Sequence, residues 1–349
     1  MGFKDWKTDG SALVEIVREG STGQHIEVSG AERVSVIIPA YNVAPYIAET
    51  LKSVFAQTEP ALEVIVVNDG SPDAEKLEEA LEPFRNLIQY LKQENRGPSG
   101  ARNTGIRAAK GDLIALLDGD DLWMPQYIET QTKFLRRHPE YDLVYCNAVF
   151  FGDSIDEATE FMMVCPSFGE ATAAAIISRK CNVFVSVTAR AQALRAIDFD
   201  ESLRSCEDLD CWLRFSASGR EIGYHRQILV KYRRRDGSLS SDPASMAEWH
   251  LKVLKKARVL WPKESNEGSL LEMATTQKTA ELAISRGRQE LRMGDVNSAL
   301  TQFTEAKRYY RSVKLSALVV LLRFAPGLLR CFFRLRGMLL PPHGESTTQ

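Results

Sequence analysis

Cysteine is scarce in this sequence, and it is not spaced as in metal sites or disulfide frameworks. Six cysteines lie scattered through 349 residues, with no C-x-x-C pair and no histidine at metal-ligand spacing. A zinc module and a disulfide-stapled secreted domain are therefore disfavoured. We expect the thiols to be reduced, as they are in cytosolic proteins.

Long apolar runs are missing as well. No uninterrupted apolar stretch approaches the 18 or more residues that a membrane span requires. The first ten residues, MGFKDWKTDG, also lack the apolar stretch of about 7–15 residues that a secretory signal carries. The sequence therefore predicts a soluble body and a cytoplasmic location.

An excess of one charge is the third absence. The chain has 44 Lys and Arg against 46 Asp and Glu, which gives a formal net charge of −2. Because nucleic-acid binding relies on a basic surface, we expect no nucleic-acid partner. The composition is that of a globular protein, with 44% hydrophobic and 26% charged residues. At about 150 residues per domain, the length predicts two domains with room for an appendage.

The sequence does contain a repeated alternation of strand and helix patterns. Four short apolar runs are each followed by a segment with apolar residues at helical spacing. This order predicts an α/β fold with a mainly parallel central sheet and helices on both faces. The pairs are 34–38 with 45–57, 63–67 with 73–84, 87–91 with 99–109, and 112–117 with 125–137. We also expect strands at 12–17, 142–152 and 228–241, a helix at 206–215, and mostly helices from about residue 246.

Polar residues follow each of the first four expected strands. These loops are 39–42, 68–73, 94–103 and 118–121. Ligand chemistry collects at the carboxyl ends of parallel strands, because loops and helix N-termini open there. We therefore expect the four loops to face one crevice.

Three carboxylates stand close together in the last of these loops, at Asp118, Asp120 and Asp121. Like charges at a sheet edge repel one another unless a cation neutralises them. Hard divalent cations such as Mg²⁺ and Mn²⁺ prefer oxygen ligands and often bind phosphates at the same time. The alternative is a capping cluster ahead of the helix that begins near Pro125, since Asp is common at helix caps.

Three other motifs are ambiguous or weak when each is taken alone. The segment NDGSPD at 68–73 consists of turn and capping residues. Glu207 and Asp208 stand at the start of a predicted helix, where the helix dipole favours carboxylates. The glycines of 97–105 fit neither G-x-G-x-x-G nor a P-loop, which disfavours a dinucleotide dehydrogenase or a kinase.

Taken together and in order, the motifs closely resemble one family. SVIIPAYN, EVIVVNDGSPD, NRGPSGARNTGIRAAKGDLIALLDGDD and CEDLDCWLRF are similar to the family 2 glycosyltransferases, over roughly residues 33–240. The resemblance implies a GT-A fold, which is Rossmann-like. It also implies an inverting enzyme whose donor is a nucleotide sugar, with a UDP-sugar as the expected donor.

The resemblance also assigns roles to individual residues. Asp120 matches the position that coordinates a divalent cation, Mn²⁺ or Mg²⁺, on the diphosphate, and the neighbouring Asp121 is expected to share that role. Asp208, in the Glu207–Asp208 pair, matches the catalytic base. The nucleotide-binding positions are Pro39, Ala40, Tyr41, Asn42, Asp69, Arg102 and Asp118.

The expected chemistry needs these residue types. An acceptor hydroxyl has a pKa far above 7, so a carboxylate must take its proton as it attacks the sugar from the side opposite the leaving nucleotide. The metal offsets the charge that develops on the departing diphosphate. One base and one metal suffice for a single displacement with inversion.

The chain departs from the family pattern in one place. Many members carry Tyr-Arg-x-His after the base helix, with the His near the metal, whereas this chain has Tyr-Arg-Arg-Arg at 232–235. Arg235 cannot ligate a cation, but it can pair with the diphosphate directly. The alternative is that these arginines form a solvated strand end.

The C-terminal region differs from the rest in composition. Residues 270–311 have a helical pattern and include LRMGDVNSALTQFTEAKRYY, which resembles one tetratricopeptide-like hairpin. A single such unit is too little for an array and indicates helices packed against the catalytic lobes. From 306 to 344 there are eight Lys or Arg and no Asp or Glu. Within the basic amphipathic segment 313–340, Pro326 is expected to break the helix.

The positions of three arginines in segment 313–340 favour binding to a membrane surface. On a helical wheel they fall within about 40° of one another, with apolar residues on the remainder; they are Arg323, Arg330 and Arg334. A basic amphipathic helix favours peripheral binding at the inner face of a membrane. The alternative is a terminal helix pair that covers the core.

These observations divide the chain into three regions. They are an N-terminal extension at 1–32, a GT-A catalytic domain at 33–245 and a helical C-terminal region at 246–349. Within the catalytic domain, 33–121 is expected to bind the nucleotide sugar and 122–245 to face the acceptor.

The main hypothesis is a glycosyltransferase of glycan or polysaccharide biosynthesis, whose acceptor is a glycan or a lipid-linked hydroxyl compound. The competing hypothesis is a catalytically silent GT-A-like scaffold that binds a membrane or a partner. A nucleotidyltransferase is disfavoured, because the sequence has no Gly-rich, Lys-bearing loop for a triphosphate.

Overall fold

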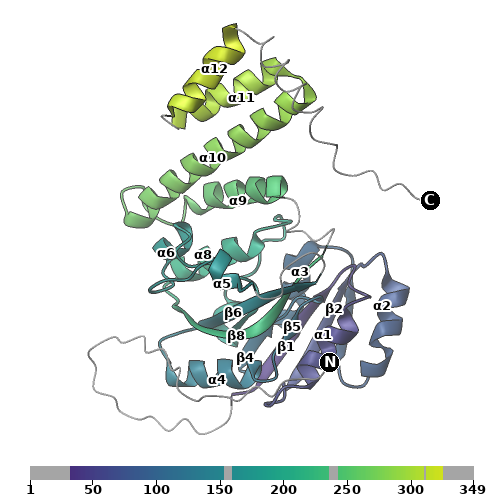
Figure 1. The fold of residues 1–349 in the computed structure, drawn as a ribbon. Coiled ribbons are helices and arrows are strands. Elements are labelled where there is room, and N and C mark those ends of the chain that lie inside the picture. Colours follow the sequence, from purple (N-terminus) through teal and green to yellow (C-terminus); the bar gives the residue numbers. More distant parts are fainter. Residues whose placement is uncertain (1–31, 153–158, 236–242, 310–311, 325–349) are drawn as a thin grey trace, which may run out of the picture.

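Four parallel strands form one half of the central sheet. The computed structural model describes residues 32–152, 159–235, 243–309 and 312–324 (Figure 1). The four strands are β1 (Val34–Ala40), β2 (Glu63–Asp69), β3 (Gln89–Gln93) and β4 (Leu113–Leu116). β1 lies between β2 and β4, and β3 flanks β2. β4 is buried along its whole length, which explains its continuous apolar run.

The second half of the sheet is mixed in direction. It contains β7 (Val187–Arg190), β6 (Leu143–Gly152), β8 (Ile222–Arg234) and the two-residue β5 (Leu122–Trp123). β7 runs antiparallel to both β4 and β6, whereas β6 and β8 are parallel. The complete order is β3-β2-β1-β4-β7-β6-β8-β5. The expected α/β architecture with a mainly parallel sheet is confirmed.

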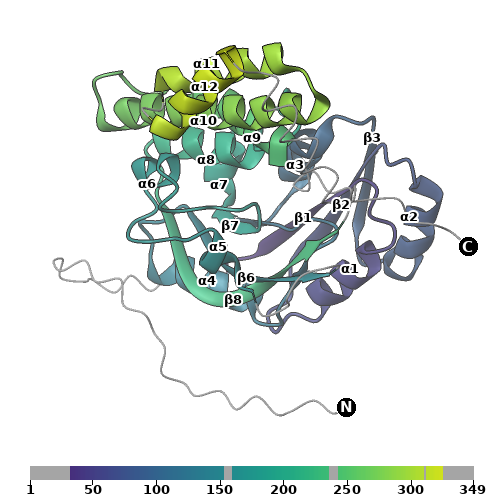
Figure 2. The ribbon, with the colours of Figure 1, turned by 45° about the horizontal axis from the view of Figure 1, so that its top comes forward.

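Helices cover both faces of the sheet (Figures 1 and 2). One face carries α1 (Ile47–Phe55), α2 (Ala74–Leu81), which continues into the short helix η1 (Glu82–Phe84), and α4 (Tyr127–Arg137). The other face carries α3 (Gly97–Ala108), α7 (Ala191–Arg195) and α8 (Glu207–Ala217). Two short helices, α5 (Phe161–Val164) and α6 (Ala173–Ile177), lie between β6 and β7 in the chain.

Most of the expected elements are present with shifted ends. The strand expected at 87–91 is β3, which begins two residues later, at Gln89. The strand expected at 228–241 is β8, which begins earlier, at Ile222, because it pairs along β6. β5 and β7 were not expected, since two and four residues are too short to show a period. The strand expected at 12–17 lies outside the described residues.

Four helices follow the sheet. They are α9 (Pro243–Ala257), α10 (Asn266–Met293), α11 (Val296–Tyr309) and α12 (Val313–Phe324). α9 packs on α8, and α10 packs on α9 and α6. α11 and α12 instead form a second apolar cluster with the C-terminal part of α10. The expectation that the C-terminal helices pack on the catalytic lobes therefore holds for α9 and α10, but not for α11 and α12.

The helical hairpin expected within 270–311 is formed by α10 and α11. Ser265 caps the start of α10, because its hydroxyl accepts a hydrogen bond from Gly268 N. Gly294 ends the helix in the left-handed conformation, with φ of 86°. Among the described helices, none is both long and apolar enough to cross a membrane.

Candidate active site

The loops that follow β1 and β2 are tied together by hydrogen bonds. Asn42 N donates to Ser71 Oγ at 2.7 Å, and Ala44 N donates to Asp73 Oδ2 at 3.0 Å. Asn42 adopts a left-handed conformation with φ of 53°, and the preceding Tyr41 is 47% exposed. The ring of Tyr41 is therefore available to stack on a ligand at this edge of the sheet.

Asp69, at the end of β2, is buried and accepts two hydrogen bonds. Its Oδ1 accepts hydrogen bonds from Gln93 Nε2 at 2.7 Å and from Arg96 N at 2.9 Å. Burial raises the pKa of Asp69, while these two donors act in the opposite direction. The side chain thus joins the loop after β2 to the loop after β3.

Gly119 allows the loop after β4 to approach the end of β1. A Cβ at this position would lie 2.8 Å from the carbonyl oxygen of Pro39, which is closer than real Cβ atoms come. Thr50 Oγ1 in α1 also donates to Gly119 O at 3.0 Å. The loop that carries Asp118 and Asp120 therefore lies directly beside residues 39–42.

Arg102 in α3 connects two carboxylates from distant parts of the chain. Its guanidinium contacts Asp118 Oδ1 at 2.7 Å and Glu207 Oε1 at 2.6 Å, and its side chain is only 4% exposed. Burial opposes the charged form, but the two carboxylates outweigh that cost and raise the pKa of Arg102. Arg102 therefore remains charged and holds the loop after β4 next to the start of α8.

Asp208 stands in the first turn of α8, beside Glu207. The residue before this pair, Cys206, has φ of 56°, an uncommon conformation for a residue that is not glycine. Asp208 is half-buried, and its Oδ1 accepts a hydrogen bond from Leu209 N at 2.7 Å. Burial and the neighbouring charge of Glu207 raise the pKa of Asp208 to about 7. A carboxyl group with this pKa suits a general base at neutral pH.

Asp120 and Asp121 are engaged by the end of β8. Arg235 Nε contacts Asp120 Oδ2 at 2.6 Å, with both side chains mostly buried. Arg233 N donates to Asp121 Oδ1 at 2.8 Å, and the Arg233 side chain donates to Asp120 O at 2.7 Å. The arginines at 233 and 235 are therefore built into the site and are not a solvated strand end.

Alternation along β8 separates the three arginines. Arg233 and Arg235 lie on the same face, with their guanidinium carbons 4.8 Å and 5.3 Å from the ring centre of Tyr46. Arg234 lies over Phe150 at 4.9 Å. Two of the three guanidinium groups therefore lie at the loop that carries Asp118, Asp120 and Asp121, which is called the carboxylate loop below. The guanidinium group of Arg234 lies on the other side of the strand.

The residues expected from sequence to form a site largely meet in one network. Its core is a set of charged side chains that are linked by ion pairs or by electrostatic interaction, namely Arg102, Asp118, Asp120, Asp121, Glu207, Asp208 and Arg235. Residues 39–42 adjoin it through Gly119. Asp69 stands one loop away and binds Gln93 and Arg96. Pro39 and Ala40 form the end of β1, and Ala40 is completely buried.

Sequence reasoning missed several residues of this network. Arg233 and Tyr46 were assigned no role of their own, although they hold Asp120, Asp121 and Arg235 in place. The alternation of a β-strand is the signal that could have paired Arg233 with Arg235. The strained conformation of Cys206 has no sequence signal of this kind.

The carboxylates suit a hard cation that also binds phosphate oxygens. Burial and the charge of Asp118 raise the pKa of Asp120, which shows that the two carboxylates repel each other. Burial and both neighbouring carboxylates raise the pKa of Asp121 well above its ordinary value. Within the described residues, no group of three His, Cys, Asp or Glu is arranged to hold a metal ion alone. Mg²⁺ and Mn²⁺ commonly use one or two carboxylates and complete their shell with phosphates and water.

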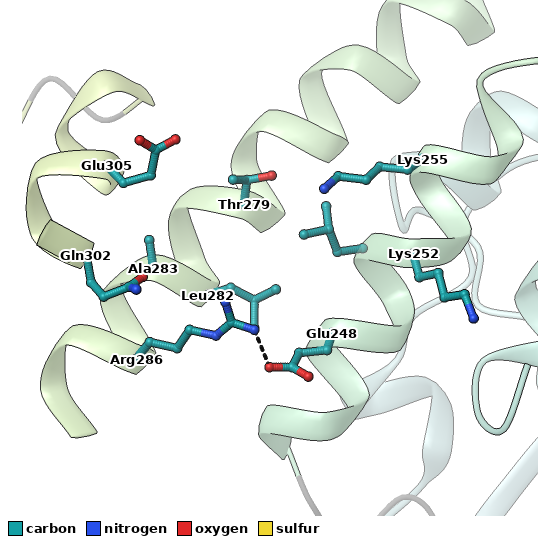
Figure 3. A pocket seen from close by; sticks show the side chains of 10 residues that line it. Glu248, Lys252, Lys255, Thr279, Leu282, Ala283, Arg286, Gln302 and Glu305 are labelled. Atoms are coloured by element: carbon teal, nitrogen blue, oxygen red, sulfur yellow. Dashed lines mark hydrogen bonds and ion pairs between the residues drawn. The ribbon is translucent and has the colours of Figure 1, made fainter. Parts of the chain in front are cut away.

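A groove of about 410 Å³ lies outside this network, between α9, α10 and α11 (Figure 3). Charges of both signs line it, and Arg286 forms an ion pair with Glu248 within it. None of the site residues expected from the sequence lines this groove. It carries no arrangement that resembles the carboxylate network.

Comparison with known proteins identifies the family. The family described as glycosyl transferase family 2 matches residues 35–185. The uncharacterized glycosyltransferase RT0329 of Rickettsia typhi is 31% identical over 260 residues, which cover 69% of this chain and 78% of the relative. The chain belongs to glycosyltransferase family 2. A second relative of this family 2 glycosyltransferase is the uncharacterized glycosyltransferase RP339 of Rickettsia prowazekii. It is 29% identical over 300 residues, which cover 79% of this chain and 91% of the relative.

Solved structures show the same GT-A fold as this family 2 enzyme. S. aureus TarS 1–349 has a TM-score of 0.57 at 20% identity, covering 86% of this chain and 89% of that chain. The mannosyltransferase PcManGT of Pyrobaculum calidifontis, solved with GDP-Man and Mn²⁺, has a TM-score of 0.56 at 20% identity, covering 89% and 86%. The expected family, the GT-A fold and the assignment as a glycosyltransferase are thus confirmed.

Proposed function

We propose that this glycosyltransferase moves a sugar from a nucleotide donor, a UDP-sugar, to a hydroxyl group by a single displacement that inverts the anomeric carbon. The observation that carries the proposal is the Arg102 bridge, which holds Asp118 beside the Glu207–Asp208 pair. A donor-side carboxylate and a candidate base thereby flank one space. TarS has also been solved with UDP-GlcNAc, which supports the choice of a nucleotide sugar.

The loops after β1, β2 and β4 would bind the donor. Tyr41 is exposed and available to stack on the base of the nucleotide, and Asn42 and Asp69 shape the loops around it. Asp118 would lie toward the ribose. Asp120, with Asp121 behind it, would hold a divalent cation, which when bound offsets the negative charge of the departing diphosphate.

Asp208 would act as the base. Because its pKa of about 7 lies close to neutral pH, it is ionised in a sufficient fraction of molecules and still accepts a proton readily. Burial is the main cause of this raised pKa, and Glu207 adds to it because a second carboxylate disfavours ionisation of the first. Arg102 fixes Glu207 and leaves Asp208 as the carboxylate that faces the acceptor.

Arg235 would neutralise Asp120 before the donor binds and pair with the diphosphate afterwards. Its contact with Asp120 is a charge-assisted hydrogen bond to the carboxylate that the cation needs. A cation that binds Asp120 therefore competes with Arg235. A guanidinium released at this position has a phosphate oxygen as its natural new partner.

The acceptor would be a glycan or a lipid-linked hydroxyl compound, in glycan or polysaccharide biosynthesis. A peripheral position at the cytoplasmic face of a membrane would bring the enzyme to lipid-linked acceptors. This position is supported by the composition of residues 306–344, which include eight Lys or Arg and no Asp or Glu.

The deciding experiment is calorimetric titration of UDP and GDP into the protein, with and without Mn²⁺, repeated on Asp120→Ala and Asp208→Asn. We expect Mn²⁺-dependent binding of UDP that is tighter than that of GDP, lost in Asp120→Ala and retained in Asp208→Asn. Asp208→Asn should also abolish transfer. Absence of nucleotide binding under every condition would overturn the proposal in favour of a silent scaffold. Loss of UDP binding in Asp208→Asn would overturn the assignment of the base.

A further inference from the structure

The outer face of α12 carries an exposed apolar stripe. Val313 is 86% exposed, Val320 52% and Phe324 76%, and Ala317 and Leu321 are also exposed. These positions follow the spacing i, i+4, i+7, i+8 and i+11, so at about 100° per residue they form a single stripe. Among the described residues, these five side chains belong to neither apolar cluster.

The opposite face of α12 is already used for packing. Leu315, Val319 and Leu322 are buried in the cluster with α10 and α11. The helix is therefore apolar on two faces, and its own protein covers only one of them. A second apolar face on an outer helix calls for an apolar partner.

Basic side chains border the exposed stripe on both sides. On a helical wheel Lys314 lies about 75° from the centre of the stripe and Arg323 about 105° from it in the other direction. The guanidinium carbon of Arg323 lies 5.9 Å from the ring centre of Phe324. Long cationic side chains beside apolar ones can reach outward to phosphate groups while the stripe is covered.

The position of α12 leaves this stripe accessible. In both ribbon views α12 lies with α10 and α11 at the end of the molecule away from the central sheet (Figures 1 and 2). Its 12 residues correspond to about 18 Å of helix, which is too short to span a bilayer. A helix of this length can lie flat in the interface of a bilayer.

We propose that the outer face of α12 inserts into the headgroup region of an anionic membrane, with Lys314 and Arg323 at the lipid phosphates. The charge pattern favours this occupant, since the surrounding sequence 306–344 is basic and free of acidic residues. The inference rests on the peripheral membrane position proposed above and names the surface that makes the contact. It does not require that the sugar-transfer reaction be correct.

Sedimentation of the full chain with lipid vesicles tests the proposal. The vesicles would contain phosphatidylcholine alone, or phosphatidylcholine with phosphatidylglycerol at about three to one. We expect the chain to bind the mixed vesicles and to lose at least roughly tenfold in affinity in the double variant Val320→Asp, Phe324→Asp, because two charges would have to enter the apolar layer. The variant that carries both Lys314→Gln and Arg323→Gln should bind the mixed vesicles more weakly and with a smaller salt dependence, whereas its binding to vesicles of phosphatidylcholine should be unchanged.

The control is Val259→Asp, which introduces one of the two added negative charges at a position that is 87% exposed but lies outside α12. It should bind vesicles as the unmodified chain does. Far-UV circular dichroism of each sample shows whether the C-terminal helices remain folded. UDP titration shows whether the donor site is intact, so failure of donor binding and failure of membrane binding are seen separately.

Three results would overturn the proposal. One is absence of binding to the mixed vesicles. Another is equal binding by the double variant, which would assign the contact to residues beyond 324. The third is a dimer in solution that the double variant abolishes, which would identify a second copy of the chain as the occupant of the stripe.

Discussion

At the scale of single residues, the site depends on charges that are paired inside the protein. Arg102 is the clearest case, because it is buried and pairs with two carboxylates from distant parts of the chain. Replacing a buried charge leaves its partners unpaired, which costs more free energy than the intact contact contributes. Such a residue is required by the architecture of the site as well as by any ligand.

Arg102→Ala is expected to lower the free energy of unfolding by about 3–5 kcal/mol, because Glu207 would remain buried, and Asp118 half-buried, without a cation. Urea denaturation measures the loss. The control is Arg107→Ala in the same helix, whose side chain is 52% exposed in its contact with Asp198 and should cost about 0.5 kcal/mol or less. Equal losses in the two variants would contradict the role of Arg102 as a buried bridge.

The raised pKa of Asp208 predicts how activity depends on pH. Only the ionised carboxylate accepts a proton, so kcat/KM should rise with pH through an apparent pKa of about 7. Initial rates between pH 5 and 9 measure the profile. A kcat/KM that does not change between pH 5.5 and 7.5 would exclude Asp208 as a base with this pKa.

Stability should show the opposite trend at the same residue. A carboxyl group whose pKa is raised from 3.8 to about 7 on folding binds its proton more tightly in the folded state. That contribution is present below pH 3.8 and is lost as the pH rises toward 7. The Tm of Asp208→Asn minus the Tm of the unmodified protein should therefore be larger at pH 8 than at pH 5. Thermal unfolding of both proteins at both pH values measures this difference. Asp198→Asn, at an exposed position, should show no such trend.

At the scale of elements, β8 is the strand that completes the carboxylate loop. Arg233 near its end binds Asp121, and Arg235, the residue directly after β8, pairs with Asp120. Arg234 between them lies over Phe150. Neighbouring residues of one strand thus carry the same charge to different places. This arrangement supplies an internal control for any test of the cation site.

Arg235→Gln should strengthen the binding of Mn²⁺ to the nucleotide-free protein by roughly tenfold, because the cation no longer competes with a charge-assisted hydrogen bond on Asp120. The same variant should bind UDP more weakly while its affinity for uridine is unchanged. Calorimetry measures both effects. Arg234→Gln removes an equal charge one residue away and should change neither. Unchanged Mn²⁺ affinity in Arg235→Gln would show that the ion pair does not control the cation site.

The elements that the sequence predicted are those with a strong local signal. The strands at β1, β2 and β4 have continuous apolar runs, and α1 repeats buried residues at helical spacing. Local patterns also predicted that the polar loops lie at one edge of the sheet, because the carboxyl ends of parallel strands meet there. The contact of Arg233 with Asp121 spans 112 positions of sequence, so no local pattern contains it. Cys206 Sγ likewise donates to Met246 O of α9 at 3.8 Å, a contact between positions 40 residues apart.

At the scale of the whole molecule, two apolar cores are stacked on each other. The larger one contains the sheet, its helices and the first part of α10. The smaller one contains the C-terminal part of α10 with α11 and α12. α10 contributes residues to both cores, so it is the helix that joins them.

Phe303→Ala should unfold the smaller core first. Phe303 is 1% exposed and packs against Gly287, where a Cβ would lie 2.9 Å from its ring. Loss of this ring should cost about 3–5 kcal/mol locally and leave UDP affinity unchanged, because the donor loops belong to the larger core. Limited proteolysis would detect early cleavage within 294–324. The exposed Tyr309→Ala in the same helix is the control, and loss of UDP binding in Phe303→Ala would contradict the independence of the two cores.

The Arg102 bridge has a consequence for the order of events in catalysis. The negative charge of Asp118 contributes to the raised pKa of Asp208. Burial and Glu207 contribute more to this pKa. A cation and donor that neutralise Asp118 would remove the repulsion from Asp118 and lower the pKa, so a larger fraction of the candidate base would be ionised once the donor is loaded. An acceptor hydroxyl that arrives before the donor would more often meet a protonated, inactive carboxyl group.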